Sequence, residues 1–413
     1  MKRVVITGLG AVSPIGLDTE SFWNGITNGK LGVGPITAFD ASGYPCRVAA
    51  QINDFNPEQY FDRRTTQRMA RFTQFALVAG DQAAKSAGLT EPLDSAQKAG
   101  VVIGSGIGGL EADSDAHRKL FEKGPSRVPA MTIPKMIVNE AAGNLAIRYG
   151  LRGPAHALAT ACASGTDAIG HAFDLIRLGR ADLMFAGGAE ATIIEFGIAV
   201  FCAVKALSTS FNDTPEKASR PFDAARDGFV MGEGAGIMVL ESLEHAMKRG
   251  APILAELAGY GVTCDAYHLT APNPEGIGAA SAIQMALADA NLTTADIDYI
   301  NAHGTSTQAN DPVETKAIKS VFGDDAYRLK VSSIKGGIGH CLGAAGGLEA
   351  IATVLAIRNR FFPPTLNLDR PDPACDLDYV PNIGQTGEIR AALSLSLGFG
   401  GHNSVIAIKR FEA

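Results

Sequence analysis

The feature that most constrains the fold is an alternation of short apolar runs with helical patterns along the whole chain. The apolar runs are short, largely apolar and mostly end near glycine or other small residues, as buried strands do. They lie at residues 4–8, 99–104, 181–187, 236–240, 297–302 and 394–398. Helical periodicity occupies residues 71–87, 165–178, 277–290, 312–322 and 346–358. Strands that alternate with helices in this way predict an α/β fold of stacked layers.

The chain has 413 residues, a length that suggests two or three units at about 150 residues each. The best boundary lies at 248–252, so the predicted domains are residues 1–250 and 251–413. Polar and apolar residues alternate near 253–260 and 404–409, which favours antiparallel strands at the edges of a sheet. Segments 160–165 and 338–346 resemble each other, but this similarity alone does not establish a duplication.

Composition excludes several classes of protein. The net charge of −7 argues against nucleic-acid binding, although a local basic patch for an acidic partner is still possible. The six cysteines are scattered without a CxxC pair, so we expect no disulfide framework, no metal site and a reducing, cytoplasmic location. The N-terminus reads as a first strand rather than a signal peptide. The apolar run 196–204 is too short to span a membrane.

Cys162 lies in the sequence TACASG at residues 160–165, between a strand-like run and a helical pattern. A cysteine at such a turn lies near a helix N-terminus, whose unpaired N–H groups stabilise a thiolate. We therefore predict a nucleophilic cysteine with a lowered pKa. A buried structural cysteine beside a tight turn explains the same residues equally well.

Three further segments carry residues suited to chemistry. NAHGTST at 301–307 places His303 just after a strand, with hydroxyls at Thr305 and Thr307. KGGIGHCLGAAG at 335–346 places Lys335 and His340 in a Gly-rich stretch before a helix of small residues. A surface loop or a solvated loop would produce these patterns too.

In the fourth segment, GFGGHN at 398–403, Phe399 stands between glycines and would be able to swing as a gate, although a tight turn before a last strand explains it as well. Taken together, one cysteine and two histidines form the pattern of a nucleophile with polar partners. Two neutral imidazoles can donate N–H bonds to an oxygen that gains charge.

These segments together resemble the β-ketoacyl-[acyl-carrier-protein] synthases, and the resemblance covers nearly the whole chain. Further matching motifs are VITGLG at 5–10, GSGIGG at 104–109, AGGAE at 186–190, SRPFD at 219–223 and RDGF at 226–229. The family implies the thiolase-like fold, with two related halves in a five-layered α-β-α-β-α arrangement, usually as a homodimer. The chain is most similar to the elongating enzymes of the second type. It retains the cysteine that chain-length-factor relatives lack, and both histidines, one of which is asparagine in initiating synthases.

The resemblance implies a reaction and roles for residues. A decarboxylative Claisen condensation joins an acyl chain on Cys162 to malonyl-acyl-carrier protein and releases CO₂ in fatty-acid elongation. His303 and His340 polarise the malonyl thioester, and the N–H groups of Cys162 and Phe399 form an oxyanion hole. Lys335 pairs with Glu349 to support the site. The residues implied to bind substrate or to line its pocket are Ile107, Phe201, Thr270, Thr305, Thr307 and Glu349.

An acidic carrier protein is the implied partner, and basic residues are its implied receptors. They are Arg63, Arg64, Arg68, Arg127 and Lys205, each of which is also explicable as a solvated surface charge. No organic cofactor is implied. The family has a monovalent-cation site, which is in question here because Leu395 replaces an amide. His402, Cys341 and Ile338 also depart from the commonest pattern.

Two alternatives within enzymes and one of a different class, a non-catalytic subunit, compete with the leading interpretation. A ketosynthase of a dedicated polyketide or aryl-polyene-like pathway would perform the same chemistry on a different acyl chain, and the departures near the gate keep this interpretation open. A thiolase would require a second cysteine in the late motif, where none is equivalent. A non-catalytic partner subunit is disfavoured because Cys162, His303 and His340 are all intact.

Overall fold

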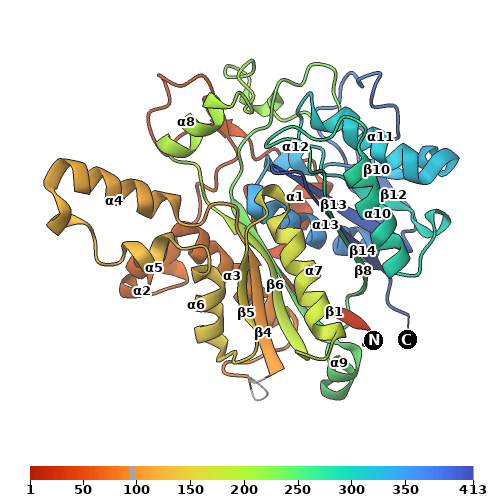
Figure 1. The fold of residues 1–413 in the computed structure, drawn as a ribbon, viewed down its shortest axis with the longest axis horizontal. Coiled ribbons are helices and arrows are strands. Elements are labelled where there is room, and N and C mark those ends of the chain that lie inside the picture. The colour runs from red at the N-terminus through yellow and green to blue at the C-terminus, as the bar shows by residue number, and fades with distance from the viewer. Residues whose placement is uncertain (94–97, 413) are drawn as a thin grey trace.

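The computed structural model of the chain describes residues 1–93 and 98–412. Its centre is a ten-stranded mixed sheet in the order β10-β9-β13-β14-β8-β1-β7-β6-β4-β5 (Figure 1). The first half of the chain supplies β1 (Val4–Val12), β4 (Ala99–Gly104), β5 (Ala155–Leu158), β6 (Leu183–Glu190) and β7 (Gly234–Ser242). The second half supplies β8 (Ala255–Cys264), β9 (Tyr299–Asn301), β10 (Lys330–Ser332), β13 (Ala391–Gly398) and β14 (His402–Lys409).

The two halves of the sheet have the same topology. In the first half β4 lies parallel to β5 and β6, and β7 and β1 follow antiparallel. In the second half β9 lies parallel to β10 and β13, and β14 and β8 follow antiparallel. The strands occur in the same order along the chain in both halves. Antiparallel pairing of β1 with β8 joins them, with Val4 opposite Leu257.

Helices complete the five layers. The inner helices α7 (Ser164–Arg177) and α13 (Ala345–Asn359) pack against both halves of the sheet, in one cluster with Met184 and Ile406. The helix α3 (Arg71–Ser86) covers the outer face of the first half, and α10 (Ile277–Asp289) with α11 (Asn310–Phe322) covers that of the second. Almost every residue of α13 is buried, because apolar and small residues surround this helix on all sides.

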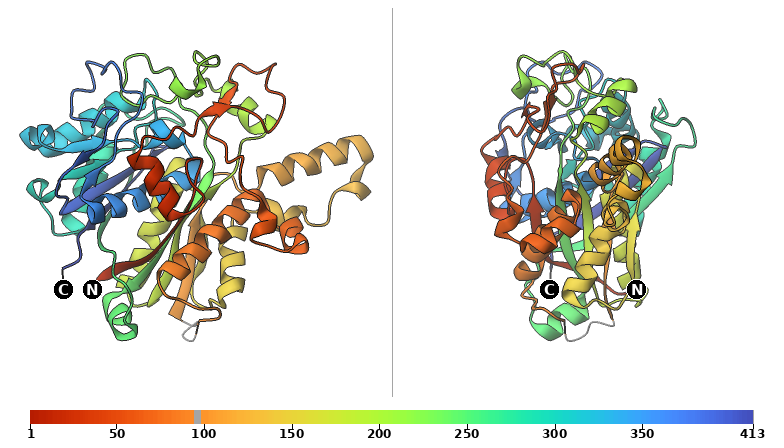
Figure 2. Two further views of the ribbon diagram at one scale, coloured as in Figure 1. Left: turned by 180° about the vertical axis from the view of Figure 1, so that it is seen from behind. Right: turned by 90° about the vertical axis from the view of Figure 1, so that its left-hand side faces the viewer.

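The other helices lie around this body. They are α1 (Thr19–Thr27), α2 (Arg63–Arg68), α4 (Leu110–Lys123), α5 (Thr132–Met136), α6 (Glu140–Tyr149), α8 (Glu195–Ala203), α9 (Leu243–Arg249) and α12 (Lys335–Ile338). Two short antiparallel strand pairs lie outside the large sheet. They are β2 (Gly34–Pro35) with β3 (Val48–Ala49), and β11 (Phe361–Phe362) with β12 (Gln385–Thr386). The helix α4 projects from the body, and the two chain ends lie close together on another side (Figures 1 and 2).

The thiolase-like α/β fold predicted from the sequence is confirmed, and each predicted strand and helix exists with small changes at its ends. The prediction of edge strands near 253–260 and 404–409 is wrong in part. Strands β8 and β14 are antiparallel, but they lie in the middle of the sheet. The division at residue 250 stays a prediction. Within residues 1–93 and 98–412, the helices are all too short or too polar to cross a bilayer.

Candidate active site

Cys162 lies in a tight turn at the start of an inner helix. The 3₁₀ turn η4 (Ala161–Ala163) follows β5 and leads directly into α7. Ala161 has φ of 51°, a left-handed conformation that is unusual for a residue with a side chain. Ser164 holds this turn closed, because its hydroxyl accepts the Thr160 N–H at 2.9 Å and donates to the Ala161 carbonyl at 2.6 Å. The sequence thus presents the Cys162 side chain where three elements meet.

The second half of the chain contains an equivalent turn. There η8 (Leu342–Ala344) leads into α13, and Leu342 has φ of 48°. The faint sequence similarity between 160–165 and 338–346 therefore corresponds to the same local geometry in the two halves.

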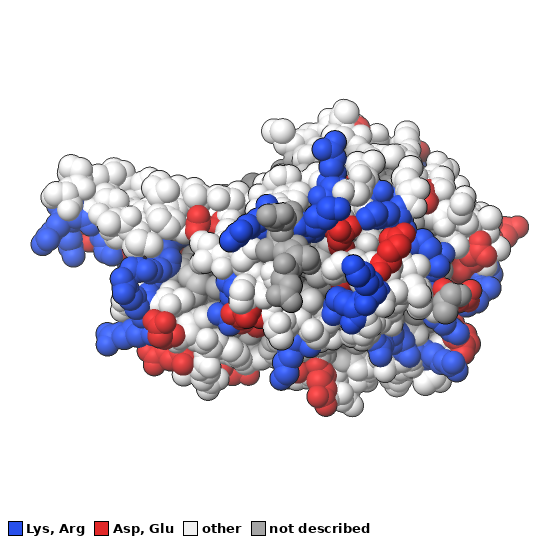
Figure 3. All heavy atoms as spheres, turned by 90° about the horizontal axis from the view of Figure 1, so that it is seen from below, with Lys and Arg blue, Asp and Glu red and all other residues white. Residues whose placement is uncertain are grey.

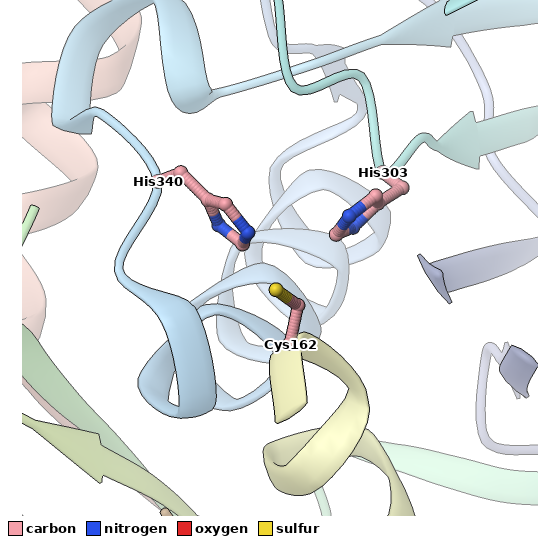
Figure 4. Close-up of side chains that lie close together, drawn as sticks. All are labelled: Cys162, His303 and His340. Atoms are coloured by element: carbon pink, nitrogen blue, oxygen red, sulfur yellow. The ribbon is translucent and has the colours of Figure 1, made fainter. Parts of the chain in front are cut away.

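Cys162, His303 and His340 converge in space although they are far apart in sequence (Figure 4). The cysteine sulfur and one ring nitrogen of each histidine all lie within 4.8 Å of one another. The two imidazole rings are nearly perpendicular, at 87°, with centroids 5.2 Å apart. His303 follows β9, and His340 lies between α12 and η8. The predicted nucleophile and its two predicted polar partners thus form one cluster.

Buried acidic and basic groups hold the His303 loop. Glu314 on α11 accepts the His303 N–H at 2.6 Å and the Gly304 N–H at 2.8 Å. Lys335 donates to the His303 carbonyl at 2.5 Å and to Glu349, so the predicted pairing of Lys335 with Glu349 is confirmed. Burial raises the pKa of Glu314 to about 7. Sequence reasoning did not identify Glu314, because an acidic residue in a helix normally faces solvent.

Both histidines are neutral at pH 7. Burial, and then the positive charge of Lys335, lowers the pKa of His303 and of His340 well below the ordinary value. Among the described residues, Nδ1 of His303 and both ring nitrogens of His340 have no hydrogen-bond partner. The ring nitrogen of each histidine that lies near the Cys162 sulfur can therefore contact a ligand in the cavity, which both residues line.

The expected lowering of the Cys162 pKa is wrong for this structure. Burial raises the pKa of the thiol to about 12. The charge of Lys335 and the N–H of Phe399 oppose this increase but do not overcome it. The thiol is only 8% exposed, so removal of water disfavours the thiolate more than the turn at the helix start stabilises it.

A cavity of about 360 Å³ opens onto the three residues. Of the residues predicted to contact substrate, Thr270, Thr305, Thr307 and Phe201 line it. Ile107 does not line it; this side chain is partly buried and packs against the cluster of buried residues that contains Cys162. Glu349 does not line it either, because its side chain is fully buried against Lys335. We therefore assign Glu349 to the support of Lys335 rather than to substrate contact.

The turn that carries Phe399 contacts the turn that carries Cys162 and also forms part of the cavity wall. Gly400 and Gly401 have φ of 87° and 78°, where glycine is favoured. The Phe399 N–H is directed at the Cys162 sulfur. A side chain at Gly398 would approach the Thr160 carbonyl to 2.7 Å. The Gly400 N–H donates to the Leu269 carbonyl at 2.8 Å, next to Thr270.

The predicted receptors of a carrier protein are all exposed, and no ion pair forms between them and other described residues. Lys205 lines the mouth of the cavity, whereas Arg63, Arg64 and Arg68 lie on α2 and Arg127 follows α4. Viewed from below, Lys and Arg gather on the projecting part of the molecule, and both signs of charge mix over the rest (Figure 3).

Buried polar atoms test the monovalent-cation site that the family resemblance implied. Asn301 and Ser394 lie opposite each other on β9 and β13, and α13, which carries Glu349, packs on β13. Both amide atoms of Asn301, Oγ of Ser394 and Oε2 of Glu349 have no hydrogen-bond partner among the described residues. Leu395 packs into the outer core on the opposite face. The oxygens present therefore fit such a cation, and the Leu395 side chain removes no ligand from this face.

Comparison with known proteins agrees with this geometry. Residues 1–246 match the family model described as "Beta-ketoacyl synthase, N-terminal domain", and residues 254–369 match "Beta-ketoacyl synthase, C-terminal domain". Proteins named 3-oxoacyl-[acyl-carrier-protein] synthase 2 from Synechocystis and Staphylococcus aureus are each 51% identical to this chain. Each alignment covers 100% of this chain and 99% of the relative.

Solved structures are similar over their full length as well. One is a ketosynthase bound to a hexaketide and in complex with a type II PKS acyl-carrier protein, with a TM-score of 0.93 and 38% identity. Another is a beta-ketoacyl synthase from Burkholderia phymatum, with a TM-score of 0.92 and 37% identity. Both alignments cover 100% of each chain.

Proposed function

The chain belongs to the beta-ketoacyl synthase family, and from that premise we infer how its own residues carry out the reaction. It is a 3-oxoacyl-[acyl-carrier-protein] synthase, an acyltransferase of fatty-acid elongation. The observation that carries the residue assignments is the convergence of the Cys162 sulfur with one ring nitrogen each of His303 and His340, within 4.8 Å.

The first half-reaction transfers an acyl group to Cys162. The sulfur attacks the thioester carbonyl of the acyl-carrier protein, and the thiol proton passes to the departing carrier thiol. The carbonyl oxygen gains negative charge as the new bond forms, and the N–H groups of Cys162 and Phe399 stabilise it. Because burial raises the pKa of the free thiol, ionisation must accompany substrate binding rather than precede it.

The second half-reaction breaks one carbon–carbon bond and makes another. The malonyl thioester oxygen accepts N–H bonds from His303 and His340, which are uncharged and so do not need to give up a proton. Release of CO₂ leaves an enolate, whose carbon attacks the acyl thioester on Cys162. The carbon–sulfur bond then breaks, the 3-oxoacyl group stays on the carrier, and the sulfur takes up a proton.

Lys335 and Glu349 support this chemistry without contacting substrate. The Lys335 ammonium donates to the His303 carbonyl, and Glu349 balances its charge. A monovalent cation bound near Asn301 would supply further positive charge beside Glu349. Thr270, Thr305 and Thr307 line the cavity, where their hydroxyls are suited to the amides of a phosphopantetheine arm.

Two assignments about partners are proposals as well. The carrier protein docks on the exposed basic residues, which complement its acidity. A second copy of the chain pairs along β5, because this strand ends the sheet order and is partly exposed, whereas β10 at the other end of the sheet is mostly buried among the described residues. A cytoplasmic location stays a prediction.

A ketosynthase of a specialised polyketide pathway is the alternative, since one similar structure is a type II polyketide ketosynthase at 38% identity. The 51% identity to 3-oxoacyl synthases favours fatty-acid elongation. A panel of carrier-bound saturated, branched and polyunsaturated acyl chains, each followed by malonyl-carrier protein, separates the two pathways. Faster turnover of the polyunsaturated chains would overturn the choice.

The assignment of the nucleophile is tested by mass spectrometry of the protein after incubation with acyl-carrier protein. We expect one acyl group on the peptide that contains Cys162. Cys162→Ser should lose this acyl group, and Cys264→Ser, which removes an exposed thiol, should keep it. Acylation of another residue, or normal condensation by Cys162→Ser, would refute the assignment.

A further inference from the structure

We propose that this site also binds a divalent metal ion of the zinc type, with Cys162, His303 and His340 as its three protein ligands. Turnover would then be sensitive to the metal, because the ion and the acyl group compete for the same sulfur. The effect on turnover rests on the proposed function, whereas the binding of the ion does not and is measured without substrate.

The donor set suits such an ion. Zinc prefers thiolate sulfur and neutral imidazole nitrogen in a tetrahedral arrangement, and a site with three protein ligands leaves a fourth position for water. The three donor atoms lie within 4.8 Å of one another. Bonds of about 2.0–2.3 Å require donors roughly 3.5 Å apart, so the side chains need to close in by about 1 Å.

Ring nitrogens without a hydrogen-bond partner indicate a ligand at this place. His340 is 2% exposed, and neither of its ring nitrogens has a hydrogen-bond partner among the described residues. Nδ1 of His303, also 2% exposed, is unpaired in the same sense. Unpartnered polar atoms at this depth are costly, and coordination of an ion satisfies one ring nitrogen of each histidine.

Access and charge also permit an ion. The cavity that reaches Cys162 also passes Thr305 and Thr307, so hydrated ions enter by the route used by substrate. Glu190 and Glu349 place negative charge near the sulfur, while Lys335 opposes a cation but is paired with Glu349.

Binding replaces a proton with the metal. The S–H bond of Cys162 breaks, the sulfur donates its electron pair to the ion, and one proton leaves to solvent, with no change in oxidation state. An acylated sulfur has no such proton to give and is a poor ligand. The ion therefore blocks acylation of the free enzyme, and the acyl-enzyme is protected from it.

Cobalt(II) provides the direct probe, because sulfur coordination gives a charge-transfer band in the near ultraviolet and tetrahedral geometry gives intense visible bands. Titration of the substrate-free protein should produce both bands at one ion per chain, with one proton released per ion, and Zn²⁺ should abolish them. Alkylation of the protein with iodoacetamide should prevent them.

Variants separate this site from incidental binding. Cys162→Ser should lose the near-ultraviolet band, and His340→Gln, which retains side-chain volume, should weaken binding at least tenfold. Two controls should bind as the unaltered protein does. Cys264→Ser removes an exposed thiol, and His171→Ala breaks the surface pair in which His156 and His171 lie 3.2 Å apart.

Retention of the sulfur band in Cys162→Ser, or its loss in either control, would overturn the proposal. The absence of any band in an unaltered protein that still acylates Cys162 would also overturn it, and the proposed function would stand. Prior acylation of Cys162 should abolish cobalt binding, and equal binding to the acylated protein would count against competition for the sulfur.

Discussion

The hydroxyl of Tyr260 donates to Oδ1 of Asp167 at 2.7 Å, and this bond connects the two halves of the molecule. Tyr260 lies on β8 in the second half, whereas Asp167 lies in the first turn of α7. The other oxygen of Asp167 accepts the hydroxyl of Thr160, two residues before Cys162. One buried carboxylate therefore links the second half of the sheet to the turn that presents the nucleophile.

Tyr260→Phe should lower both stability and the rate of acylation. The change leaves one oxygen of a buried carboxylate unpaired, which costs about 1.5–3 kcal/mol for hydrogen bonds to charged groups. Acylation of Cys162 should slow because the nucleophile turn loses an anchor, while the KM for the carrier substrate stays unchanged. Urea unfolding and acylation in a single turnover measure the two effects.

Tyr327→Phe is the matched control, because Tyr327 is 55% exposed and its hydroxyl bonds weakly to Asp376 at 3.4 Å. It should change neither quantity. If Tyr260→Phe unfolds at a lower urea concentration and yet acylates at the normal rate, the Tyr260–Asp167 bond serves the fold alone.

Glu241 should make the free energy of unfolding depend on pH in the acidic range. Its carboxylate, fully buried, accepts hydrogen bonds from Arg249, His245 and Thr7. Although burial opposes ionisation, these bonds lower its pKa from 4.5 to about 2. Because the folded pKa is the lower one, the stabilisation is complete above pH 4.5 and disappears as the pH falls towards 2. It amounts to roughly 3 kcal/mol.

The measurement is the urea midpoint of Glu241→Gln and of the unaltered protein between pH 7 and about pH 3.5. The difference between them should be constant down to about pH 4.5 and should shrink below it. Glu388→Gln, at an exposed pair with Arg410, should be close to the unaltered protein at every pH. A Glu241→Gln difference that does not change with pH would contradict the assigned pKa.

Alkylation of Cys162 should report a raised pKa in the free enzyme. Since burial raises that pKa to about 12, the thiolate is a minor species at pH 7–9. The rate of modification by iodoacetamide, followed on the Cys162 peptide, should rise about tenfold per pH unit without a plateau below pH 9. The exposed Cys264 in the same sample is an internal comparison. A plateau near pH 7 would restore the lowered pKa that the turn at the helix start suggested.

This difference shows what the sequence was unable to specify. The sequence around Cys162 shows the residue type, the turn and the nearby start of a helix. All three favour a thiolate. The degree of burial was not readable, because it depends also on residues far along the chain, including Leu342 in the same buried cluster as Cys162 and Phe399, whose N–H is directed at the sulfur. Local chemistry was predictable, whereas the balance between dipole and desolvation was not.

The misplaced edge strands have a similar cause. Alternation of polar and apolar residues in β8 and β14 normally indicates one face in water. Here both strands are covered on both faces, by α7 on one side and α10 on the other, and the hydroxyl of Tyr260 on β8 bonds to Asp167 of α7. A polar side chain that finds its partner inside the molecule gives the same sequence pattern as one in water.

The convergence of Cys162, His303 and His340 required more than spacing along the chain. The number of residues between them does not give their distance in space. Only the similarity of several motifs to a known family indicated that they belong to one site. Glu314 and Asp167 were missed because each lies in a helix where an acidic residue reads as solvent-facing, and only the packing of α11 and α7 shows them to be buried.

Substitutions should distinguish docking of the carrier protein from binding of the pantetheine arm. Reversing the charge of Arg63, Arg64 and Arg68 together should raise the KM for carrier-bound substrate about tenfold or more and leave a free pantetheine thioester unaffected. Lys205→Glu should affect both substrates, because Lys205 also lines the cavity. Arg152→Glu, at another exposed arginine, is the control and should affect neither. Equal effects of the α2 variant on both substrates would mean that these arginines act through the fold.

Phe399 should control acylation more than decarboxylation. Its N–H is directed at the Cys162 sulfur in the empty enzyme, so the same group must turn to the substrate oxygen when an acyl chain arrives. The positive φ angles of Gly400 and Gly401 give the turn conformations that make such a movement accessible. Leu397 and Phe399 both line the cavity, so a movement of this turn would change the cavity wall.

Phe399→Ala should slow acylation of Cys162 by about 10²-fold, as expected when one donor to a developing oxyanion is misplaced. Decarboxylation of malonyl-carrier protein by enzyme that already carries an acyl group should change much less, because the N–H donors of His303 and His340 are intact. Phe399→Leu, which retains most of the bulk, should recover a large part of the acylation rate. Crystals with and without a bound acyl chain should show two positions of residues 398–401. A turn that is identical in both crystals, with normal acylation by Phe399→Ala, would reduce Phe399 to a packing residue before β14.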